Sequence, residues 1–197
     1  MAGRPREFDR DTALKQAMLV FWRRGYEGTS MSDLVEVMGI ASARIYAAFG
    51  SKEALFQEAV ALYEQSDGSF ADRALGETDV RAAIETMLLE AIATYTRRGR
   101  PHGCMVVSSA TNYSASNEGV MAWLTEHRRA RTQSILERLR EALAQGQFKP
   151  GTDVDALADF YAVQLHGISV QSRDGVSKDR LLASVGPAMM PLDLALR

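Results

Sequence analysis

Apolar residues recur at helical spacing along almost the whole chain, and no segment alternates as a β-strand does. Ser30, followed three residues later by Asp33, resembles a capping box, and Ser51 can cap the helix after it. Gly25 can supply a left-handed cap at the end of the first helix. The helices expected in the first third of the chain lie at about 9–24, 31–38, 42–49 and 52–62.

The same spacing continues to the end of the chain, interrupted by turn-forming residues. Glycine and aspartate mark 66–78 as the best candidate for a loop. Gly186-Pro187 and Pro191 should bend or end the last helix. The further expected helices lie at about 79–95, 103–112, 116–145, 153–172 and 177–192. The pattern therefore predicts an all-α protein of about nine helices.

Composition narrows the class of protein. Hydrophobic residues make up 46% of the chain and charged residues 24%, which is the balance of a soluble globular protein with a sizeable core. The longest apolar runs fall far short of the roughly 20 residues that a spanning helix needs, and the N-terminus has no secretory signal. The single cysteine, Cys104, excludes an intrachain disulfide. We therefore expect a cytoplasmic protein without a membrane partner.

Charge is distributed unevenly along the chain. The net charge is −2 overall, but residues 1–52 carry eight Lys and Arg against six Asp and Glu, which leaves −4 for the remainder. A mildly basic front on an acidic body suits a small DNA-reading module attached to a domain that does not bind DNA.

The second and third helices carry the clearest functional signal. They are short and are joined by Gly39-Ile40-Ala41, which is the pattern of a helix-turn-helix. The run TSMSDLVEVMGIASARIYAAFGSKEALF, from Thr29 to Phe56, resembles the DNA-binding domain of the TetR family, and Gly3-Arg4-Pro5-Arg6 ahead of it also fits. The resemblance implies a three-helix DNA-binding domain at 1–52 and a helical domain for effector binding and dimerisation at 53–197. It also implies a regulator of transcription, commonly a repressor, and not an enzyme.

Several residues before the recognition helix are candidates for contact with DNA. Arg4 and Arg6 lie on an arm that could enter the minor groove or touch phosphate, although a solvated tail is the alternative. Thr29 and Ser30 lie at the N-terminus of the second helix, where backbone N–H groups and hydroxyls favour a phosphate. Simple helix capping is the alternative, and the two roles are compatible.

On the recognition helix, Arg44 is the single long charged side chain and can present two donors to guanine. Ser42 could reach a base edge or a phosphate, and the small Ala43 and Ala47 permit close approach to a thymine methyl. These residues leave a sparse reading face, so much of the specificity is expected to depend on Arg44 and on DNA shape.

The resemblance adds two phosphate contacts. Tyr46 resembles the family tyrosine that hydrogen-bonds the DNA backbone, and Lys52 resembles the family lysine that binds phosphate. A packing aromatic and an exposed lysine without a partner are the alternatives. The sequence departs from many relatives at Ala41, where they carry Ser or Thr, so the cap of the recognition helix could shift to Ser42.

The resemblance also implies how the parts act together. The fourth helix would be the lever through which a ligand in the body moves the reading heads, and the eighth and ninth helices would form a four-helix bundle with those of a second copy. Residues 153–172 have apolar residues on two faces, which fits one face for the core and one for a partner. The expected partners are double-stranded operator DNA, a second copy of the chain and an unidentified small-molecule effector.

An aromatic- and methionine-rich set on the fifth to eighth helices could line an apolar effector pocket, with plain core as the alternative for each member. The candidates are Met87, Tyr95, Cys104, Met105, Tyr113, Met121, Trp123, Tyr161 and Gln164.

Cys104 follows Arg97, Arg98, Arg100 and His102 at a helix start, and nearby cations together with a helix N-terminus raise thiol reactivity. Gly103-Cys104 resembles a TetR subgroup, some of whose members sense oxidants or electrophiles; an inert buried thiol is the alternative. No third and fourth ligand accompanies His102 and Cys104, so neither a metal site nor a cofactor is expected.

Two other classes of protein compete with this interpretation. A cysteine-dependent enzyme would need a histidine beside Cys104, which nothing in the spacing requires. A helical dimer could use its helix-turn-helix for protein contacts, which the basic arm and the matches at Tyr46 and Lys52 argue against. Repression and activation remain open within the favoured class.

Overall fold

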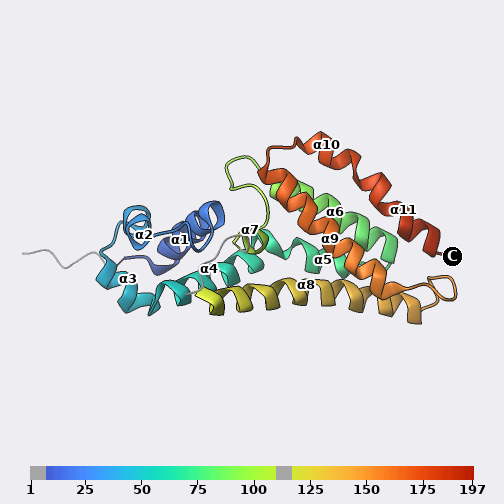
Figure 1. The fold of residues 1–197 in the computed structure, drawn as a ribbon, viewed down its shortest axis with the longest axis horizontal. Coiled ribbons are helices and arrows are strands. Elements are labelled where there is room, and N and C mark those ends of the chain that lie inside the picture. The colour runs from blue at the N-terminus through green and yellow to red at the C-terminus, as the bar shows by residue number, and fades with distance from the viewer. Residues whose placement is uncertain (1–7, 110–116) are drawn as a thin grey trace, which may run out of the picture.

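The computed structural model describes residues 8–109 and 117–197, and over these ranges it contains eleven α-helices and one 3-10 helix. The molecule is elongated, with α1–α3 at one end and α9–α11 at the other (Figure 1). The helices are α1 (Arg10–Arg24), α2 (Met31–Met38), α3 (Ser42–Phe49), α4 (Lys52–Gln65), η1 (Asp67–Ser69), α5 (Phe70–Leu75), α6 (Val80–Tyr95), α7 (Met105–Ser108), α8 (Glu118–Ala144), α9 (Val154–Arg173), α10 (Lys178–Ala183) and α11 (Val185–Ala195).

The all-α fold class and the order of the helices are confirmed, and the first four helices lie where the hydrophobic spacing places them. Ser30 and Asp33 form a capping box at the start of α2, because each side chain accepts a hydrogen bond from the backbone N–H of the other residue. Ser51 caps α4 by accepting from the backbone N–H of Ala54.

Two regions contain more helix than the sequence predicts, which raises the number above nine. The expected loop at 66–78 holds η1 and α5, because Phe70, Ala74 and Leu75 recur on one face and are buried against α6. The expected last helix is divided into α10 and α11, and Pro191 lies inside α11 instead of ending it. Ser116, the expected cap of α8, lies outside the described residues; the residue at the cap position is Asn117.

The buried side chains form two hydrophobic clusters. The first cluster holds the core of α1–α4 together with Met105 and Val106 of α7 and Val120 and Leu124 of α8. The second cluster joins α5, α6, the later part of α8, α9, α10 and α11. The core of the N-terminal unit therefore continues past residue 52 and is completed by side chains from the second half of the chain.

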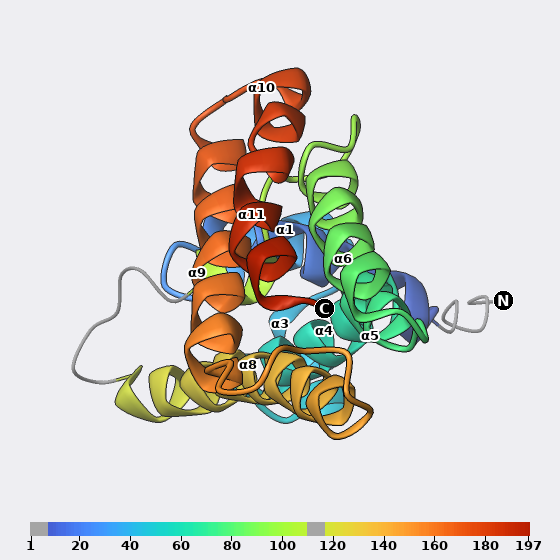
Figure 2. The ribbon, with the colours of Figure 1, turned by 90° about the vertical axis from the view of Figure 1, so that its right-hand side faces the viewer.

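The second cluster is a helical bundle in which α6, α9 and α11 lie side by side, with α10 joining α9 to α11 (Figure 2). The long helix α8 runs from the N-terminal unit along the body and packs against α9 (Figure 1). No helix among the described residues is long and apolar enough to cross a membrane.

Candidate DNA-binding surface and effector cavity

The helix-turn-helix is formed by α2 and α3. Gly39 ends α2 with a left-handed backbone, φ 65° and ψ 22°, and its N–H donates to Val35 O. The turn brings α3 to the end of the molecule that lies farthest from α11 (Figure 1). This geometry exposes one face of α3 at the tip, as a helix that enters a major groove requires.

Burial divides α3 into two faces. Ile45 and Phe49 are buried and fix the helix to the first hydrophobic cluster. The residues on the other face are exposed, and they include Ser42, Ala43, Arg44, Tyr46 and Ala47. Tyr46 is 48% exposed, which excludes it from the core and leaves its hydroxyl accessible. All five recognition-helix candidates therefore share one accessible surface.

The cap of α3 did not move to Ser42. Ala41 stands at the N-cap with an extended backbone, φ −62° and ψ 149°, and no side chain accepts a hydrogen bond from the first turn. The backbone N–H groups at this helix start are therefore open to a phosphate or to water.

The two residues before α2 differ from each other. Ser30 is exposed and donates to Asp33 Oδ2 at 2.7 Å. Thr29 is fully buried and its hydroxyl donates to Gly25 O at 2.7 Å, which removes this side chain from the expected phosphate contact. The Ser30 hydroxyl and backbone N–H and the Arg24 guanidinium lower the pKa of Asp33 to about 2.

Lys52 is not the free surface lysine of the alternative interpretation. Its ammonium lies 4.2 Å from the centroid of the Tyr26 ring, and burial lowers its pKa despite the opposing effect of Glu27. Sequence reasoning also passed over Arg10, which donates to both carboxylate oxygens of Glu58 at 2.8 Å and so ties α1 to α4. Arg4 and Arg6 lie outside the described residues.

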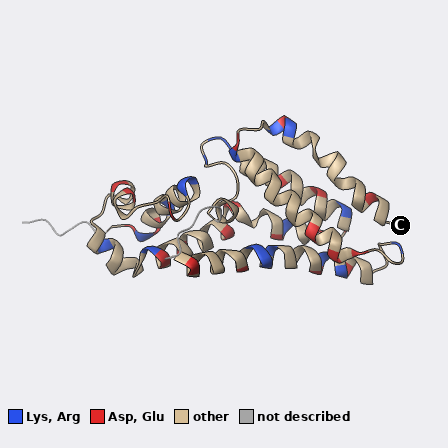
Figure 3. Ribbon diagram, viewed as in Figure 1, with Lys and Arg blue, Asp and Glu red and all other residues tan. Residues whose placement is uncertain are grey.

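Basic and acidic side chains are interspersed along the helices, including the end that holds α1–α3 (Figure 3). In this view the Lys and Arg residues of the described chain are not separated from Asp and Glu at that end.

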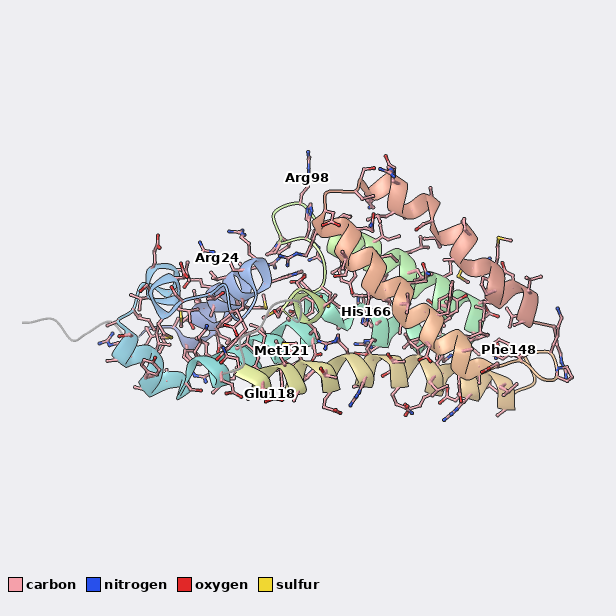
Figure 4. The ribbon with its side chains drawn as sticks, in the orientation of Figure 1. Arg24, Arg98, Glu118, Met121, Phe148 and His166 are labelled. Atoms are coloured by element: carbon pink, nitrogen blue, oxygen red, sulfur yellow. The ribbon has the colours of Figure 1, made fainter. Side chains whose placement is uncertain are left out.

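A cavity of about 60 Å³ lies where α4, α5, α6, α8 and α9 meet beside Cys104. Figure 4 places His166, one of its lining residues, between α9 and α8. The cavity is lined by Tyr63, Glu64, Gly68, Phe70, Ala71, Tyr95, Cys104, Val106, Val107, His127, Arg128, Arg131, Leu165 and His166.

Of the nine residues expected at an effector pocket, Tyr95 and Cys104 line this cavity. Met87, Met105 and Tyr161 are buried in the two cores. Met121 and Trp123, near the start of α8, pack against the first hydrophobic cluster, and Gln164 is half-buried on α9 away from the lining. Tyr113 lies outside the described residues.

Half of the cavity residues that the sequence reasoning missed are polar. Tyr63 comes from the end of α4, and Arg128, Arg131 and His127 come from the charged middle of α8. Their spacing with Val120 and Leu124 along one helix was the available signal, because residues three or four apart share a face.

Cys104 stands at the N-cap of α7 and is partly buried, and its backbone N–H donates a hydrogen bond to Ser169 Oγ at 2.8 Å. Tyr63 and Tyr95 lie beside it. Burial, and then the neighbouring Cys104 thiol, raise the pKa of both tyrosines well above the ordinary value, so their hydroxyls stay protonated. The thiol therefore shares the cavity with two phenolic donors.

A chain of contacts joins this cavity to the N-terminal unit. Trp22 of α1 donates from Nε1 to Gly103 O at 2.8 Å, one residue before Cys104. The Trp22 and Tyr63 rings meet edge to face with centroids 4.8 Å apart. His127 Nδ1 lies 2.8 Å from Glu64 Oε1, which links α8 to the end of α4. These contacts connect the cavity lining to α1 and to the end of α4.

No group of three or more His, Cys, Asp or Glu side chains in the described parts of the chain is arranged to hold a metal ion.

Comparison with known proteins identifies relatives along the whole chain. Residues 13–59 match the family described as bacterial regulatory proteins, tetR family, and residues 77–181 match the tetracyclin repressor-like C-terminal domain. The HTH-type transcriptional repressor ComR of Escherichia coli (strain K12) is 31% identical over 189 residues, which are 95% of this chain and 90% of ComR. The HTH-type transcriptional repressor BdcR of the same strain is 25% identical over 187 residues, 94% of this chain and 90% of BdcR.

Solved structures share the fold. A cysteine-substituted variant of the TetR family transcriptional regulator CifR, complexed with 26-base-pair operator DNA, superposes with a TM-score of 0.90. It is 44% identical, and the match covers 95% of this chain and 98% of that chain. A TetR transcriptional regulator from Rhodococcus sp. RHA1 is 34% identical with a TM-score of 0.61, covering 96% of this chain and all of that one.

Proposed function

Because the chain belongs to the TetR family, whose members are DNA-binding transcriptional regulators and not enzymes, we propose that it acts as a homodimeric repressor. We further propose that a small molecule or a thiol-reactive compound reaching the cavity beside Cys104 releases it from its operator. The exposed face of α3 carries the proposal, since a protein of the same fold is solved on operator DNA.

In the proposed complex, α3 lies in the major groove. Arg44 donates to a guanine, and Ser42 and Tyr46 donate to phosphates or base edges, while Ala43 and Ala47 allow close approach. Ile45 and Phe49 are buried, and their burial fixes the rotation of α3 and so the face that it presents to the groove. The first turn of α3 has no capping side chain, which favours a phosphate at the helix start.

Dimerisation is assigned to α9 and α11, the counterparts of the expected eighth and ninth helices. Val163 and Val170 on α9 are 63% and 44% exposed, and Met190 and Leu194 on α11 are 60% and 72% exposed. Large apolar side chains are seldom exposed together on a monomer, and α9 and α11 lie next to each other (Figure 2). Pairing this face with its copy would give the two-fold symmetry that a palindromic operator requires.

Coupling between cavity and DNA is assigned to α4. The helix begins with Lys52 in the DNA-facing unit and carries Tyr63 and Glu64 into the cavity lining. An effector releases the operator only if it binds more tightly to the conformation that cannot hold DNA. Tyr63 also packs against Trp22 of α1. In the proposal, a ligand that displaces Tyr63 binds the conformation in which this contact is broken and α1 has moved, and that conformation cannot hold DNA.

The first experiment is selection of bound sequences from a random duplex DNA library by the purified protein, with and without a reducing agent. The proposal predicts an enriched two-fold motif. Loss of binding on oxidation that is absent in Cys104→Ser identifies the thiol as the sensor, whereas indifference to redox state indicates a reversible ligand. No enriched motif in either condition would overturn the DNA-binding assignment of α3 and favour protein contacts for the helix-turn-helix.

Arg44→Ala tests the recognition helix on the selected operator. We expect binding to weaken by about 1–3 kcal/mol and specificity to relax at one base position. Arg129→Ala is the matched control, because Arg129 is an exposed arginine on α8 away from α3. Equal affinities for the two variants would show that Arg44 reads no base.

A further inference from the structure

The cavity beside Cys104 contains two buried hydrogen-bond donors that lack an acceptor. The Tyr63 hydroxyl and Arg128 Nη1 are both inaccessible to solvent and make no hydrogen bond within the described residues. Tyr63 as a whole is 2% exposed, and both side chains line the cavity. Leaving a buried donor without a partner costs about 1–3 kcal/mol, and more for a charged group, so the site favours a ligand that supplies an acceptor.

No carboxylate among residues 8–109 and 117–197 forms an ion pair with Arg128. Arg131 is paired with Asp72, and Glu64 Oε1 lies 2.8 Å from His127 Nδ1. In the described part of the chain, the Arg128 side chain makes one hydrogen bond. Its Nη2 donates to the neutral hydroxyl of Thr125 at 2.9 Å.

The position of Arg128 affects its own pKa and that of His166. Burial lowers the pKa of Arg128, and the nearby Cys104 thiol opposes that effect. Burial, and then the positive charge of Arg128, lower the pKa of His166 across the cavity, so His166 is neutral at pH 7. Arg128 is therefore a cation of the cavity that no carboxylate of the described residues contacts, although Glu64 and Arg131 also line the cavity.

The remaining walls of the cavity are apolar. Phe70 and Ala71 come from α5, Val106 from α7 and Leu165 from α9. These side chains offer a surface for a short hydrocarbon body but no further charge. A cavity of about 60 Å³ excludes large ligands.

We propose that this cavity binds a small carboxylate whose oxygens accept hydrogen bonds from Arg128 Nη1 and the Tyr63 hydroxyl, with its hydrocarbon part against Phe70 and Leu165. A carboxylate suits the site because it supplies one negative charge and two acceptor oxygens to one cation and one neutral donor. This inference rests on the proposed function, because it takes this cavity to be the effector site.

Both donors neighbour Cys104, which places the bound carboxylate next to the thiol. The end of α4 that carries Tyr63 would then be held by the ligand. The carboxylate thus acts on the helix that connects the cavity to the DNA-binding surface.

The test is calorimetric titration of the full-length protein with sodium butyrate, butyramide and sodium chloride at constant ionic strength. Butyrate is expected to bind saturably, and the uncharged amide and chloride are not. Arg128→Met should weaken butyrate binding about tenfold or more, and Tyr63→Phe about two- to tenfold. Arg129→Met, at the exposed neighbouring position on α8, should leave it unchanged.

Tyr63→Phe removes a buried donor that has no acceptor among the described residues and should leave the melting temperature equal or higher. Arg128→Met also removes the Nη2 hydrogen bond to Thr125, whose hydroxyl still donates to Met121 O, so the melting temperature of this variant is measured beside its butyrate binding. Binding of butyramide or chloride as tight as that of butyrate would overturn the proposal, as would an Arg128→Met protein that binds butyrate normally.

Anisotropy of the labelled operator, measured on the same preparations, separates this inference from the proposed function. Butyrate binding that depends on Arg128 but leaves the operator bound would support the carboxylate site and refute release through it. Failure to bind any operator would refute the repressor proposal without affecting the calorimetric result.

Discussion

Gly103 lies at the junction of the N-terminal unit and the body, and replacing it with alanine tests the packing there. Its φ is +76°, and a Cβ at this position would lie 2.8 Å from both Ser169 O and Arg173 Cγ and 3.1 Å from Ser169 Oγ. Arg173 Cγ belongs to a flexible side chain, but Ser169 O is backbone of α9 in a fully buried residue. The strain therefore cannot be relieved by a rotamer change alone.

Two terms contribute to the expected loss for Gly103→Ala. A left-handed backbone costs an alanine about 1–2 kcal/mol, and overpacking a filled site costs about 1–3 kcal/mol. We expect the free energy of unfolding to fall by about 2–5 kcal/mol, a large part of the 5–15 kcal/mol that is typical of a domain. The Trp22 hydrogen bond to Gly103 O should weaken as the backbone shifts.

Gly99→Ala is the matched control. Gly99 has φ +77°, but nothing lies within 4 Å of the Cβ that the substitution adds, so only the backbone term applies. Urea unfolding of both variants at one protein concentration gives the two losses, since association affects apparent stability. The Gly103→Ala loss should exceed the Gly99→Ala loss by about 1–3 kcal/mol. Equal losses would refute the close approach of α9 to Gly103.

Three further predictions concern single side chains. Asp33 has a folded pKa of about 2, below its unfolded value near 3.9. Its contribution to stability is therefore present above about pH 4 and is lost as the pH falls toward 2. In an acid titration of stability, Asp33→Asn should flatten this part of the profile. Ala41→Ser adds a cap to α3 and should raise the free energy of urea unfolding by about 0.5–2 kcal/mol, whereas Ala47→Ser inside the helix should not. Arg138 is 6% exposed and donates to carbonyls before α6, so Arg138→Met should lower the denaturation midpoint and cost about 1–3 kcal/mol; an unchanged midpoint would contradict the role of these hydrogen bonds.

Local signals in the sequence were sufficient for most of the fold. The capping pair Ser30 and Asp33, the glycine at 39 and the cap at Ser51 each act within one turn of helix, so their geometry follows from neighbours in the chain. The short α5 was missed because six residues after a glycine-containing turn give too few repeats to reveal a helical face. Its stability comes from burial against α6, which is tertiary.

The sites were predicted less evenly, for a related reason. The reading face of α3 follows from the positions of Ile45 and Phe49, because burying two residues fixes which others are exposed. Thr29 could not be distinguished from Ser30 by sequence, since both are hydroxyl residues before a helix and only packing buries the first. In the body, a periodic stripe does not reveal whether its residues face a core or a cavity.

Arg128 illustrates the limit best. It lies in a run of charged residues on α8 that is typical of a solvated face, and its neighbour Arg129 is indeed exposed. Arg128 is turned inward because α9 and the end of α4 cover that side of the helix. Which of two adjacent arginines enters the cavity is decided by helix rotation of about 100°, a quantity that only the packed structure supplies.

The distance from Lys52 to Tyr63 sets the scale of the motion that α4 could transmit. Eleven residue steps span about 16 Å of helix, so a tilt of about 10° at the Tyr63 end would swing the Lys52 end through about 3 Å. That arc is close to the rise of about 3.4 Å between successive bases on a DNA strand. In a dimer both arcs add, so a modest rotation of α4 suffices to put two reading heads out of step with the spacing of their half-sites.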